Sequence, residues 1–453
     1  MKDIPEEKVF FKAENYQVKN GIFYYDLWGS RESKYQQLKE LNIYEIKWET
    51  VNPQSPFYLF TPQDTFLLEE YNQGYKITDI MPINVLGFQT HRDHFAIDFD
   101  RENLYNRIDE MRDKNISDDD FLTKYNLKES SSWKINKVRQ NIKNDSQWED
   151  KLIDCLYRPF DWRSCYYNSM IMDRPRRELI NHVMGKDNLC LLASRQKATV
   201  GYYHCLVTNK PANDCVISAT SREANQVFPL YIYPDDNNEQ IFTQKEDKQA
   251  NFSPKFITAI TEKLGYIPTP EKIFYYIYSV LHSPNYRQRY AQFLKIDFPR
   301  IPLTSNQELF NQLANKGEIL VNLHLLKQLP DIKLTQSNFL ASEDLPIFDQ
   351  EEKGIFHYQG NDKNEIKQIK YDEIEKRIII DKDCYFTGIN RELWEFKIGG
   401  YQVLDKWLKD RKKANLTLSE SDIKHYQKVI ISLNETMKIM EEIDQIILQF
   451  PLP

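Results

Sequence analysis

The sequence has 453 residues, 41% of them hydrophobic and 13% aromatic, which excludes a disordered chain and allows roughly two or three domains. Its formal net charge of −7 argues mildly against a nucleic-acid binder, but DNA responds to local patches and net charge is only an average. No run of about 18 apolar residues is present, and Met1 to Glu7 are polar and charged. We therefore expect a cytoplasmic protein with neither a membrane span nor a signal peptide.

Near the start, Ile22–Tyr25 predicts a short strand, Arg31–Leu41 a helix and Tyr44–Trp48 a second strand. This order is typical of the closing edge of a sheet whose other strands lie elsewhere. The prolines that then interrupt the pattern and predict a linker are Pro53, Pro56 and Pro62.

A mixed region of short strands and helices follows, from about Thr78 to Pro234. Asp235–Ser253 has the composition of a polar linker. After it, Ile273–Leu281 predicts an apolar helix that Ser283-Pro284 ends, and Tyr286–Leu294 predicts another helix. Within the mixed region, strands are expected at Asn188–Ala193, Gly201–Val207, Val216–Ala219 and Leu230–Tyr233.

The last long element is a helix predicted at Asp422–Leu448, roughly 40 Å long at ~1.5 Å per residue. Ser419 and Asp422 have the spacing of a capping box at its start. The apolar residues at helical spacing are Tyr426, Ile430, Leu433, Met437 and Met440. This apolar stripe either packs against the chain's own domain or binds a partner helix in a coiled coil.

Several motifs of enzymes are absent from the sequence. It has no GxxxxGK[ST] phosphate loop and no GxGxxG turn. Asn52–Phe57 approaches the Asn-Pro-Pro-aromatic motif of amino-methyltransferases, but two residues intrude between the prolines. His91 and His94 have the spacing of metal ligands on a helix, yet no third clustered ligand accompanies them. We predict neither a metal site nor a complete cofactor fold.

Six cysteines form no CxxC pair, so we interpret them as reduced core thiols rather than as a disulfide framework or a zinc site. No serine or cysteine nucleophile elbow is present either. The sequence therefore predicts no catalytic residue. The cysteines are Cys155, Cys165, Cys190, Cys205, Cys215 and Cys384.

Arginines, amides and hydroxyls are concentrated beside aromatic residues in the middle of the chain. Between Lys151 and Val200, nine Lys or Arg stand against five Asp or Glu, so this stretch is locally +4. Guanidinium groups suit guanine edges and phosphates, Asn and Gln suit adenine, and hydroxyls position the duplex. For Arg158 and Arg163 the alternative is an internal ion pair with Asp161. The predicted DNA-binding residues are Arg92, Arg158, Arg163, Arg174, Arg176, Arg177, Arg195, Gln196, Lys197, Ser221, Arg222 and Asn225.

Long strings of the sequence resemble the C-terminal specificity region of type ISP restriction–modification enzymes, from about Gly21 to Ile447. These are single-chain proteins that join nuclease, translocase, adenine methyltransferase and target-recognition parts. Tyr24–Glu32 looks like the tail of the family's methyltransferase domain. The strings that carry the resemblance are Leu281–Thr304, Phe88–Asp93, Leu156–Asp161, Phe228–Pro234 and Ile398–Arg411.

The resemblance implies an α+β chain in three parts: an edge of an α/β methyltransferase domain (1–65), a target-recognition domain (75–335) and a C-terminal part with the long helix (336–453). It implies sequence-specific binding of double-stranded DNA that directs adenine methylation and cleavage by upstream domains. S-adenosylmethionine, ATP and Mg²⁺ would belong to those domains, with no cofactor in this chain. The alternatives are half of a split adenine methyltransferase, assembled with a separate upstream chain, and a protein-interaction subunit that uses the last helix.

Overall fold

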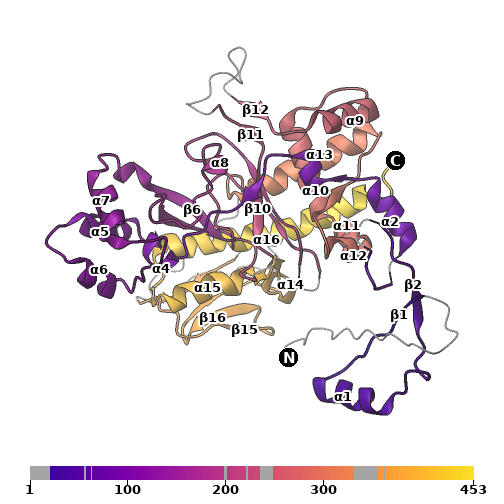
Figure 1. Ribbon diagram of the computed structural model, residues 1–453, viewed down its shortest axis with the longest axis horizontal. Coiled ribbons are helices and arrows are strands. Elements are labelled where there is room, and N and C mark those ends of the chain that lie inside the picture. The colour runs from indigo at the N-terminus through magenta and orange to yellow at the C-terminus, as the bar shows by residue number, and fades with distance from the viewer. Residues whose placement is uncertain are drawn as a thin grey trace, which may run out of the picture. The chain divides into compact units, whose positions relative to one another are not determined.

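The computed structural model describes residues 21–55, 58–62, 64–197, 201–220, 223–234, 248–330, 356–361 and 363–453. Helices and short, mostly antiparallel sheets alternate along the chain, which confirms the predicted α+β class (Figure 1). The chain divides into two units, Met1–Gln73 and Gly74–Pro453. Within the described ranges, no helix combines the length and apolar content that crossing a bilayer requires.

In the first unit, strand β1 (Ile22–Tyr24) pairs antiparallel with β2 (Glu49–Val51), and helices α1 (Arg31–Glu40) and α2 (Thr65–Asn72) complete it. The predicted first strand and helix are confirmed. The predicted strand at 44–48 is wrong, because the Trp48 indole donates to the Ile43 carbonyl at 2.8 Å and closes a turn there. The second strand begins only after this turn.

The second unit contains a four-stranded antiparallel sheet formed, in spatial order, by β4 (Val85–Leu86), β10 (Asn225–Pro229), β8 (Cys190–Ser194) and β9 (Cys205–Thr208). Every residue of β8 and β9 is buried, which explains why their sequences are continuous apolar runs. The strands predicted at 188–193 and 201–207 correspond to β8 and β9.

The strand predicted at 216–219 is wrong. Val216 and Ile217 are fully buried but lie in a loop. The Ile217 amide donates to the Asn225 side chain at 3.2 Å, and its carbonyl accepts from the Gly400 amide at 3.1 Å. Because these partners satisfy the backbone, an apolar segment can be buried here without joining a sheet.

A second, three-stranded sheet has the order β5 (Ile97–Asp98), β7 (Asp161–Tyr166), β6 (Leu152–Arg158). Strands β6 and β7 form a tight hairpin in which Phe160 adopts a left-handed φ of 57°. Beside this sheet lies a helical lobe with its own core, visible at the left of Figure 1. Its helices are α4 (Asp93–Ala96), α5 (Arg101–Arg112), α6 (Asp118–Lys124) and α7 (Ile135–Asn144), followed by a 3-10 turn at Glu149–Lys151. Farther along the chain, α8 spans Arg177–Ile180.

Helices α9 (Pro254–Leu264), α10 (Pro270–His282) and α11 (Pro284–Arg289) each begin with a proline after a capping Ser or Thr. The predicted helix at 273–281 is confirmed as α10. The helix predicted at 286–294 is divided at Tyr290 into α11 and α12 (Ala291–Leu294). Helix α13 (Gln307–His324) packs against α10. The second unit also contains α3 (Ile77–Ile80) and two strand pairs. In these pairs, β3 (Tyr75–Lys76) lies beside β13 (Arg300–Ile301), and β11 (Tyr231–Ile232) lies beside β12 (Gln249–Ala250).

The C-terminal sheet has the order β14 (Tyr358–Gln359), β17 (Cys384–Phe386), β16 (Arg377–Asp381), β15 (Lys370–Asp372). The elements α14 (Arg391–Trp394), β18 (Lys397–Ile398), β19 (Tyr401–Gln402) and α15 (Val403–Lys413) follow, and α16 (Glu420–Ile446) ends the fold. The capping box at the start of α16 is confirmed.

Helix α16 joins the parts of the second unit, and Figure 1 shows it passing from α15 to the helices α10 and α13. Tyr426 in its first half packs against Phe386, with ring centroids 4.6 Å apart. Near the middle of α16, Ser432 donates to the Leu323 carbonyl of α13 at 2.8 Å. The first three residues of the apolar stripe are therefore buried by the chain itself, and Met437 and Met440 are half-buried. One core contains residues from both sides of the predicted division at 335 and 336. All six cysteines are free, as predicted, and all except the half-buried Cys215 are buried.

Candidate nucleic-acid interface

The four-stranded sheet brings several candidate residues to one of its ends. Because Asn225 pairs with Ser194 and Gln226 pairs with Leu86 in antiparallel register, the loops after β4 and β8 and the loop before β10 emerge together. The pairing of Ala193 with Cys205 adds the loop before β9. We call these the sheet-end loops; their described residues are 87–93, 195–197, 201–204, 218–220 and 223–224.

A further loop, 173–177, is attached to the same end. The Arg174 amide donates to the Gln89 carbonyl and the Gln89 amide donates to the Arg174 carbonyl, both at 3.0 Å. The Gln89 side chain donates to Asp214 at 2.6 Å. Residues far apart in the sequence therefore converge: the arginine cluster at 174–177 lies beside the segment that contains Arg92.

Four of the predicted residues expose their polar groups there. Arg174 and Gln196 are exposed, and neither side chain bonds to any other side chain in the part of the chain that the structure describes. Arg195 is 62% exposed, with Nε 3.1 Å from an oxygen of Asp297, a carboxylate that also pairs with Lys76 at 2.8 Å. Arg177 is exposed and donates to Ser169 at 2.5 Å. Arg174 and Gln196 can therefore bind a ligand with all their side-chain polar atoms, whereas Arg195 and Arg177 offer the rest of an exposed guanidinium that already has one partner.

Arg92 and Arg176 are half-buried at the rim of these loops. The Arg92 guanidinium lies over the Trp133 ring, 4.2 Å from its centroid, and donates to the Ile171 carbonyl at 3.1 Å. Burial lowers the pKa of Arg92, although Asp173 opposes this effect. Arg176 has a left-handed φ of 55°, and its buried Nε finds no hydrogen-bond partner in the described parts of the chain. The Arg92 side chain therefore holds the loop backbone, whereas the Arg176 side chain is only half-buried there.

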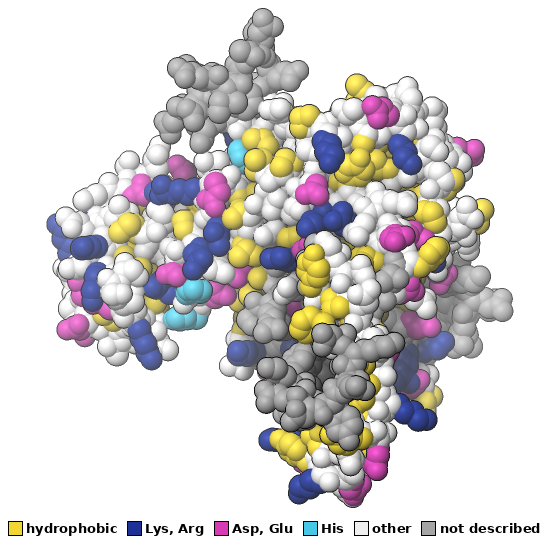
Figure 2. Space-filling model, turned by 45° about the vertical axis from the view of Figure 1, so that its right-hand side comes forward, with side chains coloured by type: hydrophobic (Ala, Val, Ile, Leu, Met, Phe, Trp, Pro, Cys, Tyr) yellow, Lys and Arg dark blue, Asp and Glu magenta, His cyan; other side chains and the backbone are white. Residues whose placement is uncertain are grey.

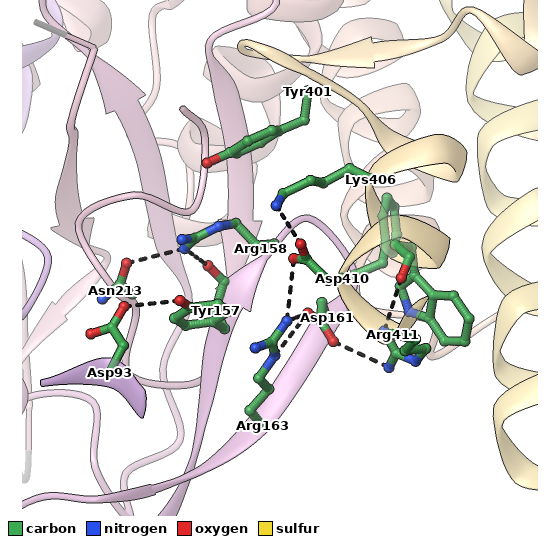
Figure 3. Close-up of polar contacts among 12 residues, drawn as sticks. Asp93, Tyr157, Arg158, Asp161, Arg163, Asn213, Tyr401, Lys406, Asp410 and Arg411 are labelled. Atoms are coloured by element: carbon green, nitrogen blue, oxygen red, sulfur yellow. Dashed lines mark hydrogen bonds and ion pairs between the residues drawn. The ribbon is translucent and has the colours of Figure 1, made fainter. Parts of the chain in front are cut away.

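Arg158 and Arg163 point inward (Figure 3). Among the described residues, the expected ion pair with Asp161 forms at Arg163 but not at Arg158, which has other internal partners. Arg163 donates twice to Asp161, at 2.9 and 2.6 Å, and lies 3.3 Å from Asp410. Arg158 stacks on the Tyr157 ring, 3.9 Å from its centroid, and donates to Asn213 at 3.2 Å. We remove both from the candidate interface, because their guanidinium groups are occupied within the fold.

Lys197 and Asn225 are internal as well. Lys197 donates to the Gly201 carbonyl at 2.7 Å, and burial together with the nearby Lys295 lowers its pKa to about 8, although Glu223 opposes this shift. The fully buried Asn225 donates to the Asn213 carbonyl at 3.1 Å and accepts from Ile217. Asn225 is corrected from a candidate base contact to a residue that shapes the loop. Ser221 and Arg222 lie outside the described residues.

A buried polar cluster beneath the loops was not predicted. Glu223 and His204 are fully buried, with a carboxylate oxygen 3.5 Å from the imidazole Nε2. Ser218 donates to the Glu223 carboxylate at 2.6 Å, and Ser194 donates to its carbonyl at 2.7 Å. The cluster anchors the segment before β10 to β8. Nothing in the sequence indicates that Glu223 is buried, because a single Glu in a polar segment is normally exposed.

His91 and His94 do not converge on a metal. His91 is exposed, with a left-handed φ of 51°, and its Nδ1 lies 2.8 Å from Asp173. The His94 ring bonds to the Tyr125 carbonyl at 3.1 Å. In the described ranges, no group of three or more His, Cys, Asp or Glu side chains could hold a metal ion.

On the face drawn in Figure 2, cationic and anionic side chains are interspersed rather than gathered in one patch. This face therefore shows no broad basic patch, and the candidate interface rests on the sheet-end loops.

A comparison with curated proteins gives no match. Three solved structures share the fold: a nuclease-deletion mutant of the Type ISP restriction-modification enzyme LlaGI in complex with a DNA substrate mimic (19% identity, TM-score 0.61), a DrdV–DNA complex (18%, 0.65) and the ATP-dependent Type ISP restriction-modification enzyme LlaBIII bound to DNA (19%, 0.62). They cover 93%, 96% and 92% of this chain, which in turn spans 32%, 43% and 27% of theirs.

The family model of the Type ISP C-terminal specificity domain matches residues 79–442. This range contains the four-stranded sheet, the helical lobe, the C-terminal sheet and nearly all of α16. With most of its length inside the match, the chain belongs to the Type ISP C-terminal specificity domain family.

Proposed function

We propose that this chain recognises a short sequence in double-stranded DNA as the specificity part of a type ISP restriction–modification enzyme. The family supports this function, and so does the fold, which three enzymes in DNA complexes share. The chain spans less than half of each of those proteins. Adenine methylation and cleavage would be carried out by upstream domains, which would bind S-adenosylmethionine, ATP and Mg²⁺.

The observation that carries the proposal is the exposure of Arg174, Arg177, Arg195 and Gln196 at one end of a sheet whose strands β8 and β9 are buried. A guanidinium fork bonds the two acceptors of guanine in the major groove, and a Gln amide bonds adenine in the same way. Each such contact discriminates against the wrong base by about 1–3 kcal/mol. Strand β8 holds the start of the loop that carries Arg195 and Gln196, and the Gln89–Arg174 backbone pair holds the loop of Arg174, so these groups emerge from anchored backbone, as sequence reading requires.

In the complete enzyme, the bound sequence would place a target adenine at the methyltransferase site. Methylation of a base inside a duplex requires that the base be rotated out of the stack. This chain would supply the binding energy that fixes the register on the duplex, while the chemistry would take place elsewhere.

The test is a selection from a pool of random duplexes with the purified chain, followed by affinity measurements for the enriched sequence and for scrambled duplexes over a series of salt concentrations. We expect one short sequence to be enriched and bound at least about 10³-fold more tightly than scrambled DNA. Equal affinity for every duplex at moderate salt would overturn the proposal.

A further inference from the structure

Helix α7 has two chemically different faces. Its buried face consists of Ile135, Val138 and Ile142 and packs into the core of the helical lobe. On the opposite face, the exposed side chains have spacings of three and four residues and so form one strip. The residues of this strip are Lys137, Gln140, Asn141 and Asn144.

The strip lines an open groove of about 560 Å³ together with Asp145, Lys151 and Met170. Asp145 is the one carboxylate among these lining residues, and it forms an ion pair with Lys151. No hydrogen bond within the described parts of the chain engages the side chains of Gln140, Asn141 or Lys137. The groove therefore presents amide donors and an ammonium group without an excess of negative charge.

Helix propensity does not explain this strip. Asn is among the poorer helix formers, at a cost of up to about 0.7 kcal/mol relative to Ala, and packing does not constrain exposed positions. Glu has a higher helix propensity than Asn and would keep the same face polar at a lower cost in helix stability. A second open groove of the lobe uses such residues: three carboxylates line it, those of Asp109, Glu110 and Asp113, together with Asn106, Arg112 and, from α7, Lys143. The choice of neutral amides on one side of a helix whose other side faces acids favours an anionic ligand in the first groove.

One loop, 168–172, contacts both the groove and the candidate interface. Met170 lines the groove, and its carbonyl accepts from the Trp133 indole just before α7, at 2.8 Å. The preceding residue, Ser169, accepts from Arg177 at 2.5 Å. The Ile171 carbonyl accepts from Arg92. A duplex that contacts Arg177 thus lies one loop away from the strip.

We propose that the α7 groove binds the sugar–phosphate backbone of the DNA that flanks the recognised sequence. This inference rests on the proposed function, because it assumes that a duplex lies against the sheet-end loops. Lys137 would neutralise a phosphate, and Gln140 and Asn141 would donate hydrogen bonds to phosphate oxygens. Such contacts fix the register of the protein and add affinity without reading bases.

The experiment compares the wild-type chain with a triple variant, Lys137→Ala, Gln140→Ala and Asn141→Ala, in which alanine preserves the helix. Both are titrated with duplexes that carry the selected sequence and flanks of increasing length on either side. The matched control is Lys143→Ala, on the same helix but beside the acidic groove. Circular dichroism and the unfolding midpoint establish that all variants are folded.

We expect wild-type affinity to rise with flank length on one side, and the triple variant to lose roughly tenfold on the longest duplex but nothing on the shortest. The slope of log affinity against log salt should fall by about 1, as for one lost phosphate contact. A triple variant that keeps the gain from the flank and the wild-type slope would overturn the α7 site. If wild-type binding is equal for all sequences but the triple variant is still weaker, the α7 site stands and sequence recognition fails. Absence of any DNA binding would overturn both.

Discussion

Arg411 of α15 and Asp161 of β7 form a buried ion pair, with the guanidinium Nη2 3.2 Å from the carboxylate Oδ1 and side-chain exposures of 8% and 1% (Figure 3). The same carboxylate accepts two hydrogen bonds from Arg163. Burial alone would raise the pKa of Asp161, but the two guanidinium groups outweigh it and hold the pKa below its usual range. The arginine-rich hairpin is therefore bound to the C-terminal part of the second unit rather than presented to a ligand.

Replacement of Asp161 by Ala should destabilise the fold by about 3 kcal/mol or more, because it leaves two buried guanidinium groups without their shared carboxylate. Urea denaturation followed by tryptophan fluorescence measures the change. The matched control is Glu373→Ala, which removes an exposed ion pair with Arg391 and should leave the unfolding midpoint unchanged. Equal midpoints for D161A and wild type would show that the network contributes nothing to stability.

Arg163→Met and Arg174→Ala should separate folding from DNA binding. Arg163 is held between two carboxylates, so its loss should lower the unfolding midpoint but leave the affinity of the folded protein for the selected duplex unchanged. Arg174 is exposed, so its loss should weaken affinity by about tenfold or more without a change in the midpoint. Affinity measured by fluorescence anisotropy, on samples verified as folded, distinguishes the two. The reverse pattern would return Arg163 to the interface and remove Arg174 from it.

Two buried histidines should make the fold sensitive to mild acid. His324 bonds to Tyr278 at 2.5 Å and to Thr436 at 2.9 Å, and burial, with a contribution from Arg287, lowers its pKa to about 3. Burial also lowers the pKa of His282 well below its usual value. The unfolded chain binds protons near pH 6.5 that the folded chain does not, so stability is complete above that pH and is lost as pH falls toward the folded pKa.

Between pH 7 and pH 5, protonation of the unfolded chain at His324 should reduce the free energy of unfolding by roughly 2 kcal/mol. His282 should act in the same direction. Urea denaturation at pH 7, 6 and 5 measures the slope. His324→Gln keeps a polar side chain but cannot take up the proton, so its slope should be smaller than that of the wild type even if its stability at pH 7 is lower. A wild-type stability that is flat over this interval would contradict the expected burial of neutral imidazoles.

Gly317 of α13 lies against the backbone of α10. A β-carbon built on it would come within 1.9 Å of the Tyr275 carbonyl oxygen, a backbone atom that cannot move independently of the helix. Gly317→Ala should therefore destabilise the fold by about 2 kcal/mol or more, although helix propensity alone predicts a gain of about 1 kcal/mol. Gly185→Ala is the control, because no atom lies within 4 Å of its added carbon and only a left-handed φ of 69° opposes it. A stabilised G317A would mean that α10 and α13 are farther apart.

The sequence by itself determined the elements whose signals are local. The helix at Asp422–Leu448 with its capping box and the apolar helix ended by Ser283-Pro284 correspond to α16 and α10, because periodicity and capping act within a few residues of each other. The resemblance to the type ISP family could also be found from the sequence, because comparing stretches of sequence requires no knowledge of which residues are in contact. The same local rules failed at 216–219, where an apolar run is buried as a loop and the hydrogen bonds come from distant residues.

Only the tertiary structure decided which polar side chains face outward. Arg163 and Arg174 each stand close to an aspartate in the sequence, but Arg163 lies between Asp161 and Asp410, whereas Arg174 forms no ion pair with any described residue. Whether a guanidinium is neutralised depends on the residue that folding brings to within about 4 Å, here from 247 positions away along the chain. Antiparallel register likewise placed Gln89, Arg174 and Arg195 at one end of a sheet, a convergence that no spacing along the chain encodes.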